Sequence, residues 1–137
     1  MNQSKITKIL IVDDDRRMVK TLLYIFKMKG YETEAAFSGP EALKKVAENH
    51  FDCILSDIEM PGMNGVELHR TIKDRQPDLP VILMTAYTDD KLVKEGMEQG
   101  AIAVLTKPLK IDVLLSFVST ACKERSIETE ANHGYQG

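Results

Sequence analysis

This sequence of 137 residues has few cysteines and histidines, little net charge and only short apolar runs. Cys53 and Cys122 lie far apart, which favours buried reduced thiols, and so the cytosol, over a disulfide framework. His50, His69 and His133 lack metal-ligand spacing, so surface roles are expected for them. The first apolar run is too short for a signal-peptide core or a membrane span. With 18 basic and 21 acidic residues, the net charge of −3 gives no general attraction to nucleic acid or membrane.

What is present is enough apolar sequence for one compact domain, with 43% hydrophobic and 28% charged residues. Four short apolar runs, 9–12, 53–55, 81–84 and 102–105, are continuous, as expected of parallel strands that are covered on both faces. A fifth segment, 31–36, alternates in polarity and is expected to form a half-exposed edge strand.

Helical patterns separate these strands, with capping residues or glycines near several helix ends. Five alternations of strand and helix predict an α/β fold, a doubly wound (βα)5 sandwich around a five-stranded parallel sheet. The last helix is expected over 111–125, after which apolar periodicity is lost. The domain is therefore expected over 1–125, and 126–137 are expected to form a polar tail or the start of a linker.

Polar residues stand at the carboxyl ends of four predicted strands. They are Asp13, Asp14 and Asp15 after the first strand, Asp57 after the third, Thr85 after the fourth and Lys107 after the fifth. Because the carboxyl ends of parallel strands meet at one edge of a sheet, these side chains are expected to converge. Asp15 is expected to be a helix cap, a common role for Asp in this position.

Asp13, Asp14 and Asp57 would form a carboxylate cluster whose mutual repulsion calls for a cation. Oxygen ligands without nearby cysteine or histidine favour a hard ion, and a site of few carboxylates suits Mg²⁺ best. The Lys107 ammonium and the Thr85 hydroxyl would face the same pocket. Together with the metal they could neutralise a transferring phosphoryl group, with Asp57 as the nucleophile.

Four motifs make the chain resemble the receiver domains of two-component response regulators, the CheY-like superfamily. They are IVDDD, LSDIEMPGMNG, LMTA and LTKP, in the family's order and spacing, and the resemblance covers nearly the whole chain. It implies a flavodoxin-like sheet of strand order 2-1-3-4-5. It also implies a cytoplasmic switch phosphorylated by a cognate sensor histidine kinase. Such a domain catalyses only its own phosphorylation and dephosphorylation, so we expect no turnover enzyme.

The resemblance implies a role for each residue of the predicted cluster. These roles are phosphoacceptor for Asp57, Mg²⁺ ligands for Asp13, Asp14, Asp57 and the backbone carbonyl of Glu59, and phosphoryl-oxygen contacts for Thr85 and Lys107. A cis Lys107–Pro108 peptide bond is implied as well.

Phosphorylation would draw Thr85 inward, and the helix expected to begin at Thr88 has a sparse apolar face that suits a mobile element. The resemblance implies that the face formed by this helix, strand 102–105 and helix 111–125 then controls an output domain, a partner protein or a receiver–receiver homodimer. Val104 stands where the family usually has a switching aromatic residue. We hypothesise that Tyr87 does part of that work.

Three alternative functions fit the sequence less well. A phosphatase of the haloacid dehalogenase kind carries a second Asp two residues after its nucleophile, where Glu59 stands here. An FMN binder of this fold needs a glycine-rich and hydroxyl-rich loop after the first strand, where residues 13–15 would repel phosphate. A receiver used only for docking would lack the acceptor or the lysine, and both are present.

The sequence carries no effector signature that would identify an output. No helix-turn-helix, P-loop or catalytic motif follows residue 125. The chain is therefore expected to be a stand-alone regulator or the receiver of a longer transcriptional regulator, and the second is favoured. The receiver itself is not expected to bind nucleic acid or membrane.

Overall fold

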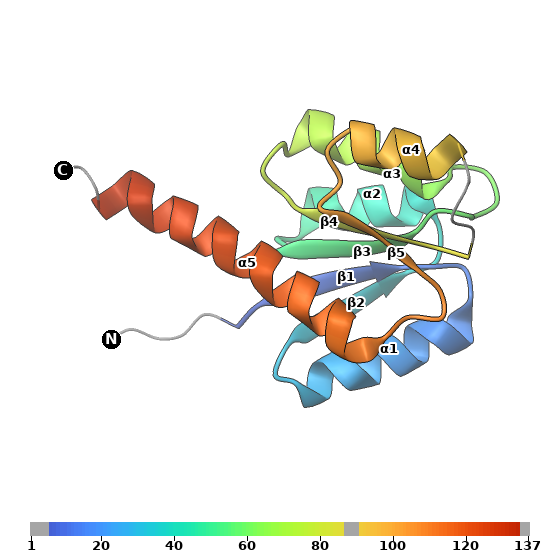
Figure 1. Ribbon diagram of the computed structural model, residues 1–137, viewed down its shortest axis with the longest axis horizontal. Coiled ribbons are helices and arrows are strands. Elements are labelled where there is room, and N and C mark those ends of the chain that lie inside the picture. Colours follow the sequence, from blue (N-terminus) through green and yellow to red (C-terminus); the bar gives the residue numbers. More distant parts are fainter. Residues whose placement is uncertain (1–5, 87–90, 135–137) are drawn as a thin grey trace.

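The computed structural model describes residues 6–86 and 91–134, with side chains as far as Cys122 (Figure 1). In this part of the chain five strands alternate with five helices. The elements are β1 (Lys8–Val12), α1 (Arg16–Met28), β2 (Glu32–Ala36), α2 (Gly39–Glu48), β3 (Cys53–Asp57), α3 (Gly65–Arg75), β4 (Val81–Thr85), α4 (Lys91–Glu98), β5 (Ala103–Thr106) and α5 (Ile111–Gly134). All strands pair in parallel, in the order β2-β1-β3-β4-β5, which confirms the predicted doubly wound fold.

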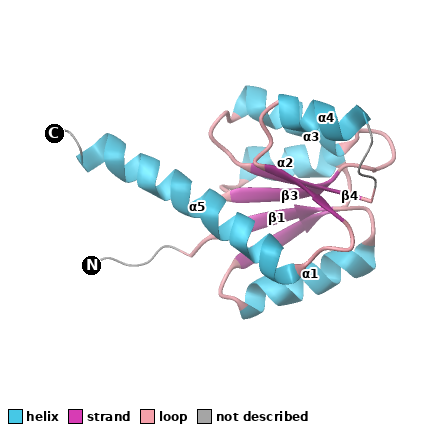
Figure 2. Ribbon diagram, viewed as in Figure 1, coloured by secondary structure: helices cyan, strands magenta, loops and turns pink. Residues whose placement is uncertain are grey.

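Helices cover both faces of the sheet (Figure 2). Side chains of α1 and α5, among them Phe26 and Leu114, pack against one face in a buried apolar cluster. Side chains of α2 and α3, among them Val46 and Ile72, pack against the other face together with parts of α4. Burial of each such side chain contributes ~1.5–3 kcal/mol to folding. These two clusters hold the strands, and therefore the strand ends, in place.

The three central strands and the two edge strands differ in burial. Every residue of β3 and β4 is buried, as are four of the five residues of β1. β2 is half-exposed at one edge, as predicted. β5 was expected to be covered on both faces, but Val104 and Leu105 are only partly buried because β5 is the other edge of the sheet. A continuous apolar run therefore did not identify a strand that is covered on both faces in this case.

Three helices begin at side-chain caps. Asp15 caps α1 by accepting hydrogen bonds from two backbone N–H groups of the first turn, as predicted. Ser38 caps α2 by accepting one hydrogen bond, from the backbone N–H of Glu41. Asn64 and Glu67 form a reciprocal capping box at the start of α3, a feature that was not predicted from the sequence. The expected start of the fourth helix at Thr88 lies outside the described residues.

The last helix is longer than predicted. It was expected to end near Arg125, but α5 continues to Gly134, and its second half extends beyond the sheet (Figure 1). The reason is that residues 126–133 contain no proline or glycine, so helix propensity continues where the apolar pattern stops. None of the described helices has both the length and the apolar character needed to cross a bilayer.

His69 corrects the expectation that all histidines would lie on the surface. Its side chain is 3% exposed, on the buried stripe of α3 that also holds Gly65 and Ile72. Burial lowers the pKa of His69, against the opposing effect of its hydrogen bond with Gln99, which follows α4. The spacing of 65, 69 and 72 is that of one helix face, so helical periodicity accounts for the burial.

Candidate functional site

Polar side chains from four adjacent strands meet at one edge of the sheet. Asp57 and Thr85 are the last residues of β3 and β4, while Asp13 and Lys107 directly follow β1 and β5. The parallel registers bring these strand ends level with one another. The predicted convergence of these residues is therefore present in the structure.

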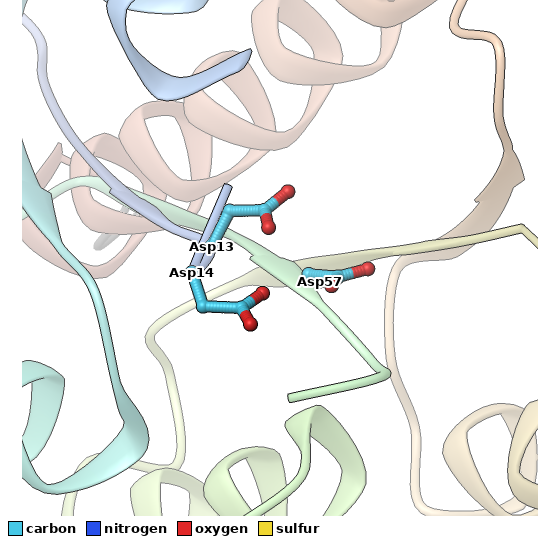
Figure 3. A group of neighbouring side chains, drawn as sticks. All are labelled: Asp13, Asp14 and Asp57. Atoms are coloured by element: carbon cyan, nitrogen blue, oxygen red, sulfur yellow. The ribbon is translucent and has the colours of Figure 1, made fainter. Parts of the chain in front are cut away.

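Three carboxylates lie together at this edge (Figure 3). One oxygen from each of Asp13, Asp14 and Asp57 lies within 4.8 Å of the others. Asp13 is 0% exposed and Asp57 is 3% exposed, whereas Asp14 is open to solvent. The Asp15 backbone N–H donates a 3.0 Å hydrogen bond to Asp13 Oδ1, which orients that carboxylate. Burial, and after it the charge of Asp13, raises the pKa of Asp57 to about 6.

Lys107 places its ammonium between the two buried carboxylates. Its Nζ lies 3.0 Å from Asp57 Oδ1 and 3.1 Å from Asp13 Oδ2. Only the contact with Asp13 has the angles of a hydrogen bond, so Asp57 Oδ1 is a buried oxygen without a hydrogen-bond donor among the described groups. Burial lowers the pKa of Lys107, but the contacts with Asp57 and Asp13 outweigh it and leave the pKa raised. The lysine therefore stays charged at neutral pH.

The backbone around Lys107 fits this placement. The Lys107–Pro108 peptide bond is cis, as the resemblance implied. The backbone N–H of Lys107 donates a 2.7 Å hydrogen bond to the carbonyl oxygen of Thr85. The end of β5 is thereby attached to the end of β4 next to the carboxylates.

Thr85 is buried, and its hydroxyl contacts a residue that was not expected to bind it. The hydroxyl donates a 2.5 Å hydrogen bond to Glu59 Oε2, and the backbone N–H of Ala86 donates a 3.3 Å hydrogen bond to Glu59 Oε1. The resemblance to receiver domains implied that the backbone carbonyl of Glu59 is a metal ligand and that its side chain lies beside the route of water to the phosphoryl group. Both roles stay predictions. No sequence signal marks the side-chain contact, because it depends on how the loop after β3 folds back toward β4.

A glycine allows the loop after Asp57 to close tightly. A Cβ at Gly65 would collide with the carbonyl oxygen of Asp57 and would lie 2.8 Å from the Cα of Ile58. The Gly65 N–H donates a 2.9 Å hydrogen bond to the Ile58 carbonyl. The start of α3 therefore packs directly against the backbone that carries the phosphoacceptor candidate, with no room for a side chain.

Of the two residues considered for a role in switching, Val104 and Tyr87, the structure describes only Val104. Val104 packs, partly buried, against the core cluster shared with α4, close to the position that a Cβ on Gly96 would occupy. It therefore links β5 to α4 without an aromatic ring. Tyr87, for which a coupling role was hypothesised, lies outside the described residues.

Comparisons with known proteins give a consistent result. Residues 9–119 match the sequence profile of the response regulator receiver domain. The chain is 36% identical over 131 residues to the regulatory protein AtoC of Escherichia coli strain K12, which covers 96% of this chain and 28% of AtoC. It is 38% identical over 105 residues to the sporulation initiation phosphotransferase F of Bacillus subtilis strain 168, which covers 77% of this chain and 85% of that protein. The chain thus spans less than a third of AtoC.

Solved structures agree with the sequence matches. The crystal structure of a CheY-like response regulator receiver domain protein from Methanospirillum hungatei JF-1 superimposes with a TM-score of 0.86 at 31% identity. The superposition covers 90% of this chain and 99% of that one. The likeness therefore extends over the whole of the solved domain, including the strands that carry the carboxylates.

Proposed function

Since this chain belongs to the response regulator receiver domain family of two-component systems, we propose that Asp57 is its phosphoacceptor, phosphorylated by a sensor histidine kinase. The observation that carries the proposal is the surroundings of Asp57. Its carboxylate is buried at a strand end, beside Asp13 and 3.0 Å from the Lys107 ammonium. A buried, ionisable nucleophile next to a fixed cation suits transfer of an anionic group.

We also propose that Asp13, Asp14 and Asp57, with the backbone carbonyl of Glu59, hold Mg²⁺. The side chains fit such an ion, because they offer only oxygen ligands and one oxygen of each lies within 4.8 Å of the others. They include the buried Asp57 Oδ1, which accepts no hydrogen bond from the described groups. When bound, a divalent cation supplies positive charge that offsets the carboxylates and the oxygens of a transferred phosphoryl group.

The chemistry of the residues themselves follows from their positions. A carboxylate oxygen of Asp57 attacks the phosphorus of a phosphohistidine and forms a P–O bond. The P–N bond breaks, its electron pair stays on the imidazole nitrogen, and that nitrogen takes up a proton. Lys107 is close enough to Asp57 to contact the phosphoryl oxygens. Water later attacks the same phosphorus, releasing phosphate and restoring the carboxylate, so the domain acts as a switch and not as a turnover enzyme.

The output surface in this proposal is the face formed by α4, β5 and α5. Exposed apolar side chains support it: Met97 (51% exposed), Ile102 (42%), Val113 (39%) and Phe117 (36%). We propose that phosphorylation changes the affinity of this face for an output domain, a partner protein or a second receiver. Because histidine kinases draw on cellular ATP, we assign this switch to the cytoplasm.

The proposed domain organisation follows the predicted boundaries. Residues 1–125 would form the receiver, and 126–137 would begin the connection to another segment. The helical continuation of α5 past residue 125 is compatible with a helical connection of this kind. Control of transcription is the favoured output, because one similar protein is the transcriptional regulatory protein ZraR of Escherichia coli strain K12, of which the matched region is 28%.

The proposal is tested by intact mass after incubation with acetyl phosphate and Mg²⁺. We expect the wild-type chain to gain one phosphoryl group, ~80 Da, and to lose that gain when Mg²⁺ is withheld. Asp57→Asn should gain nothing, while Asp52→Asn, another carboxylate of the same strand region, should behave as wild type. A folded wild-type chain that gains no mass, or an Asp57→Asn chain that does, would refute Asp57 as the acceptor.

A further inference from the structure

The two donors at the end of β4 are already engaged by an anion that belongs to the protein. The Thr85 hydroxyl and the Ala86 N–H each donate to a different oxygen of the Glu59 carboxylate, at 2.5 Å and 3.3 Å. Both donors directly follow Met84, the residue that pairs with Asp57 in the sheet. Resting on the function proposed above, we propose that Glu59 is an internal competitor for the phosphoryl site.

The competition follows from the chemistry of the donors. A threonine hydroxyl has a single proton and donates to one acceptor at a time. The hydroxyl of Thr85 therefore cannot hold Glu59 and a phosphoryl oxygen with the same hydrogen bond. Thr85 is 1% exposed, so water does little to replace a hydrogen bond that either acceptor loses at this site.

Charge favours the exchange only after phosphorylation. Glu59 is one of the groups that raise the pKa of Asp57, after burial and Asp13, so the two carboxylates are close enough to repel each other. Phosphorylation replaces the single negative charge of the Asp57 carboxylate with up to two on the phosphoryl group, which would repel Glu59 while attracting the Thr85 and Ala86 donors. Glu59 therefore stabilises the unphosphorylated arrangement of the junction between β4 and α4, and it opposes the phosphorylated one.

The backbone favours a direct exchange. The Ile58 N–H donates a 2.8 Å hydrogen bond to the Met84 carbonyl, so the chain entering Glu59 is attached to β4 one residue before Thr85. Glu59 can move its side chain without disturbing this bond. Substitution of the Glu59 side chain also keeps its backbone carbonyl, the proposed metal ligand, in place. The competition can therefore be tested separately from metal binding.

The first test is the affinity for beryllofluoride, a phosphoryl analogue that binds to acceptor carboxylates, measured by calorimetry in the presence of Mg²⁺. Loss of a hydrogen-bonded, charged competitor should tighten binding by about tenfold in Glu59→Ala, and by a smaller factor in Glu59→Gln. Glu48→Gln, which removes one exposed carboxylate at the end of α2, should bind as wild type. In Thr85→Ala, the further change Glu59→Ala should gain less than it does in the wild type, because the shared donor is gone.

The second test needs neither metal nor analogue. The amide proton of Ala86, followed by NMR, should move upfield in Glu59→Ala because it loses a carboxylate acceptor, and it should stay in place in Glu48→Gln. An unchanged Ala86 resonance overturns the proposed competition. So does an equal beryllofluoride affinity in wild type and Glu59→Ala, in which case Asp57-dependent binding still leaves the phosphoacceptor proposal standing. If the wild type binds no beryllofluoride in an Asp57-dependent way, the phosphoacceptor proposal fails and the competition fails with it.

Discussion

Lys107 Nζ lies 3.0 Å from Asp57 Oδ1 and binds the neighbouring Asp13 at 3.1 Å, so one ammonium serves two buried carboxylates. The lysine follows an edge strand, whereas Asp13 follows one central strand and Asp57 is the last residue of another. The sheet therefore creates an anionic pocket and supplies its counter-charge from a different strand. Several measurable properties depend on this arrangement.

Removal of the lysine should destabilise the fold in a pH-dependent way. Lys107→Met leaves Asp13 and Asp57 without their cation, and we expect the free energy of unfolding to fall by ~1–3 kcal/mol at pH 7.5 without Mg²⁺. The loss should shrink below pH 6, because Asp57 then takes up a proton. Urea denaturation at both pH values measures it, with Lys110→Met, an exposed lysine three residues on, as the control. Equal losses at both pH values would contradict the ion pair.

The ionised Asp57 side chain should lower the free energy of unfolding at neutral pH. Its pKa of about 6 lies above the ordinary 3.8, so ionisation costs the folded state free energy that is absent below pH 3.8 and complete above pH 6. Asp57→Asn should therefore be ~1–3 kcal/mol more stable than wild type at pH 8 without Mg²⁺, and the gain should vanish as the pH falls to 4. Thermal denaturation across this range checks the sign, and Asp74→Asn, an exposed carboxylate on α3, should show no such trend.

Substitution of two adjacent aspartates should affect metal binding differently. Asp14 belongs to the carboxylate cluster, whereas Asp15 caps α1. Both Asp14→Asn and Asp15→Asn remove one charge, and asparagine caps a helix as well as aspartate does. We expect Mg²⁺ to raise the melting temperature of the wild type and of Asp15→Asn, and to do so at clearly higher concentrations for Asp14→Asn. Equal Mg²⁺ dependence in the two variants would exclude Asp14 as a ligand.

Two glycines between the end of β3 and the first turn of α3 should respond differently to substitution by alanine. Gly62 has a φ of 76° with open space around it, so Gly62→Ala should cost only the ~1–2 kcal/mol of a left-handed residue. At Gly65 the new Cβ would meet the backbone of Asp57 and Ile58, so Gly65→Ala should cost more and should also slow phosphorylation by displacing Asp57. Chemical denaturation and the mass assay measure both effects. A Gly65→Ala chain as stable as Gly62→Ala would show that the contact relaxes.

The convergence of Asp13, Asp57 and Lys107 could be predicted because it depends only on strand order and strand ends. In a parallel sheet the carboxyl ends share one edge, and apolar runs locate the strands well enough to find the residues that follow them. The contact between Glu59 and Thr85 could not be predicted in this way. It depends on the rotamer of one side chain in a turn, and nothing in the sequence pattern fixes that rotamer.

Other differences have similarly local causes. The apolar run of β5 resembles a central strand because α4 and α5 partly cover Val104 and Leu105, although the strand lies at an edge. His69 is buried because it shares a helix face with apolar neighbours, which outweighs the polarity of its ring. Composition predicts the average environment of a residue type, and these positions depend on neighbours that only the folded chain brings together.

The long α5 helix gives the domain a mechanical property that its compact part lacks. Leu114, Val118 and Ala121 fasten the first part of the helix to the sheet, and the backbone continues for a further three turns or so, ~18 Å, beyond Cys122. A tilt of about 10° at the fastened part would move the far end by ~3 Å over this length. If a slight rearrangement around Asp57 and Thr85 tilted α5, the far end of the helix would therefore move further than the part that packs on the sheet.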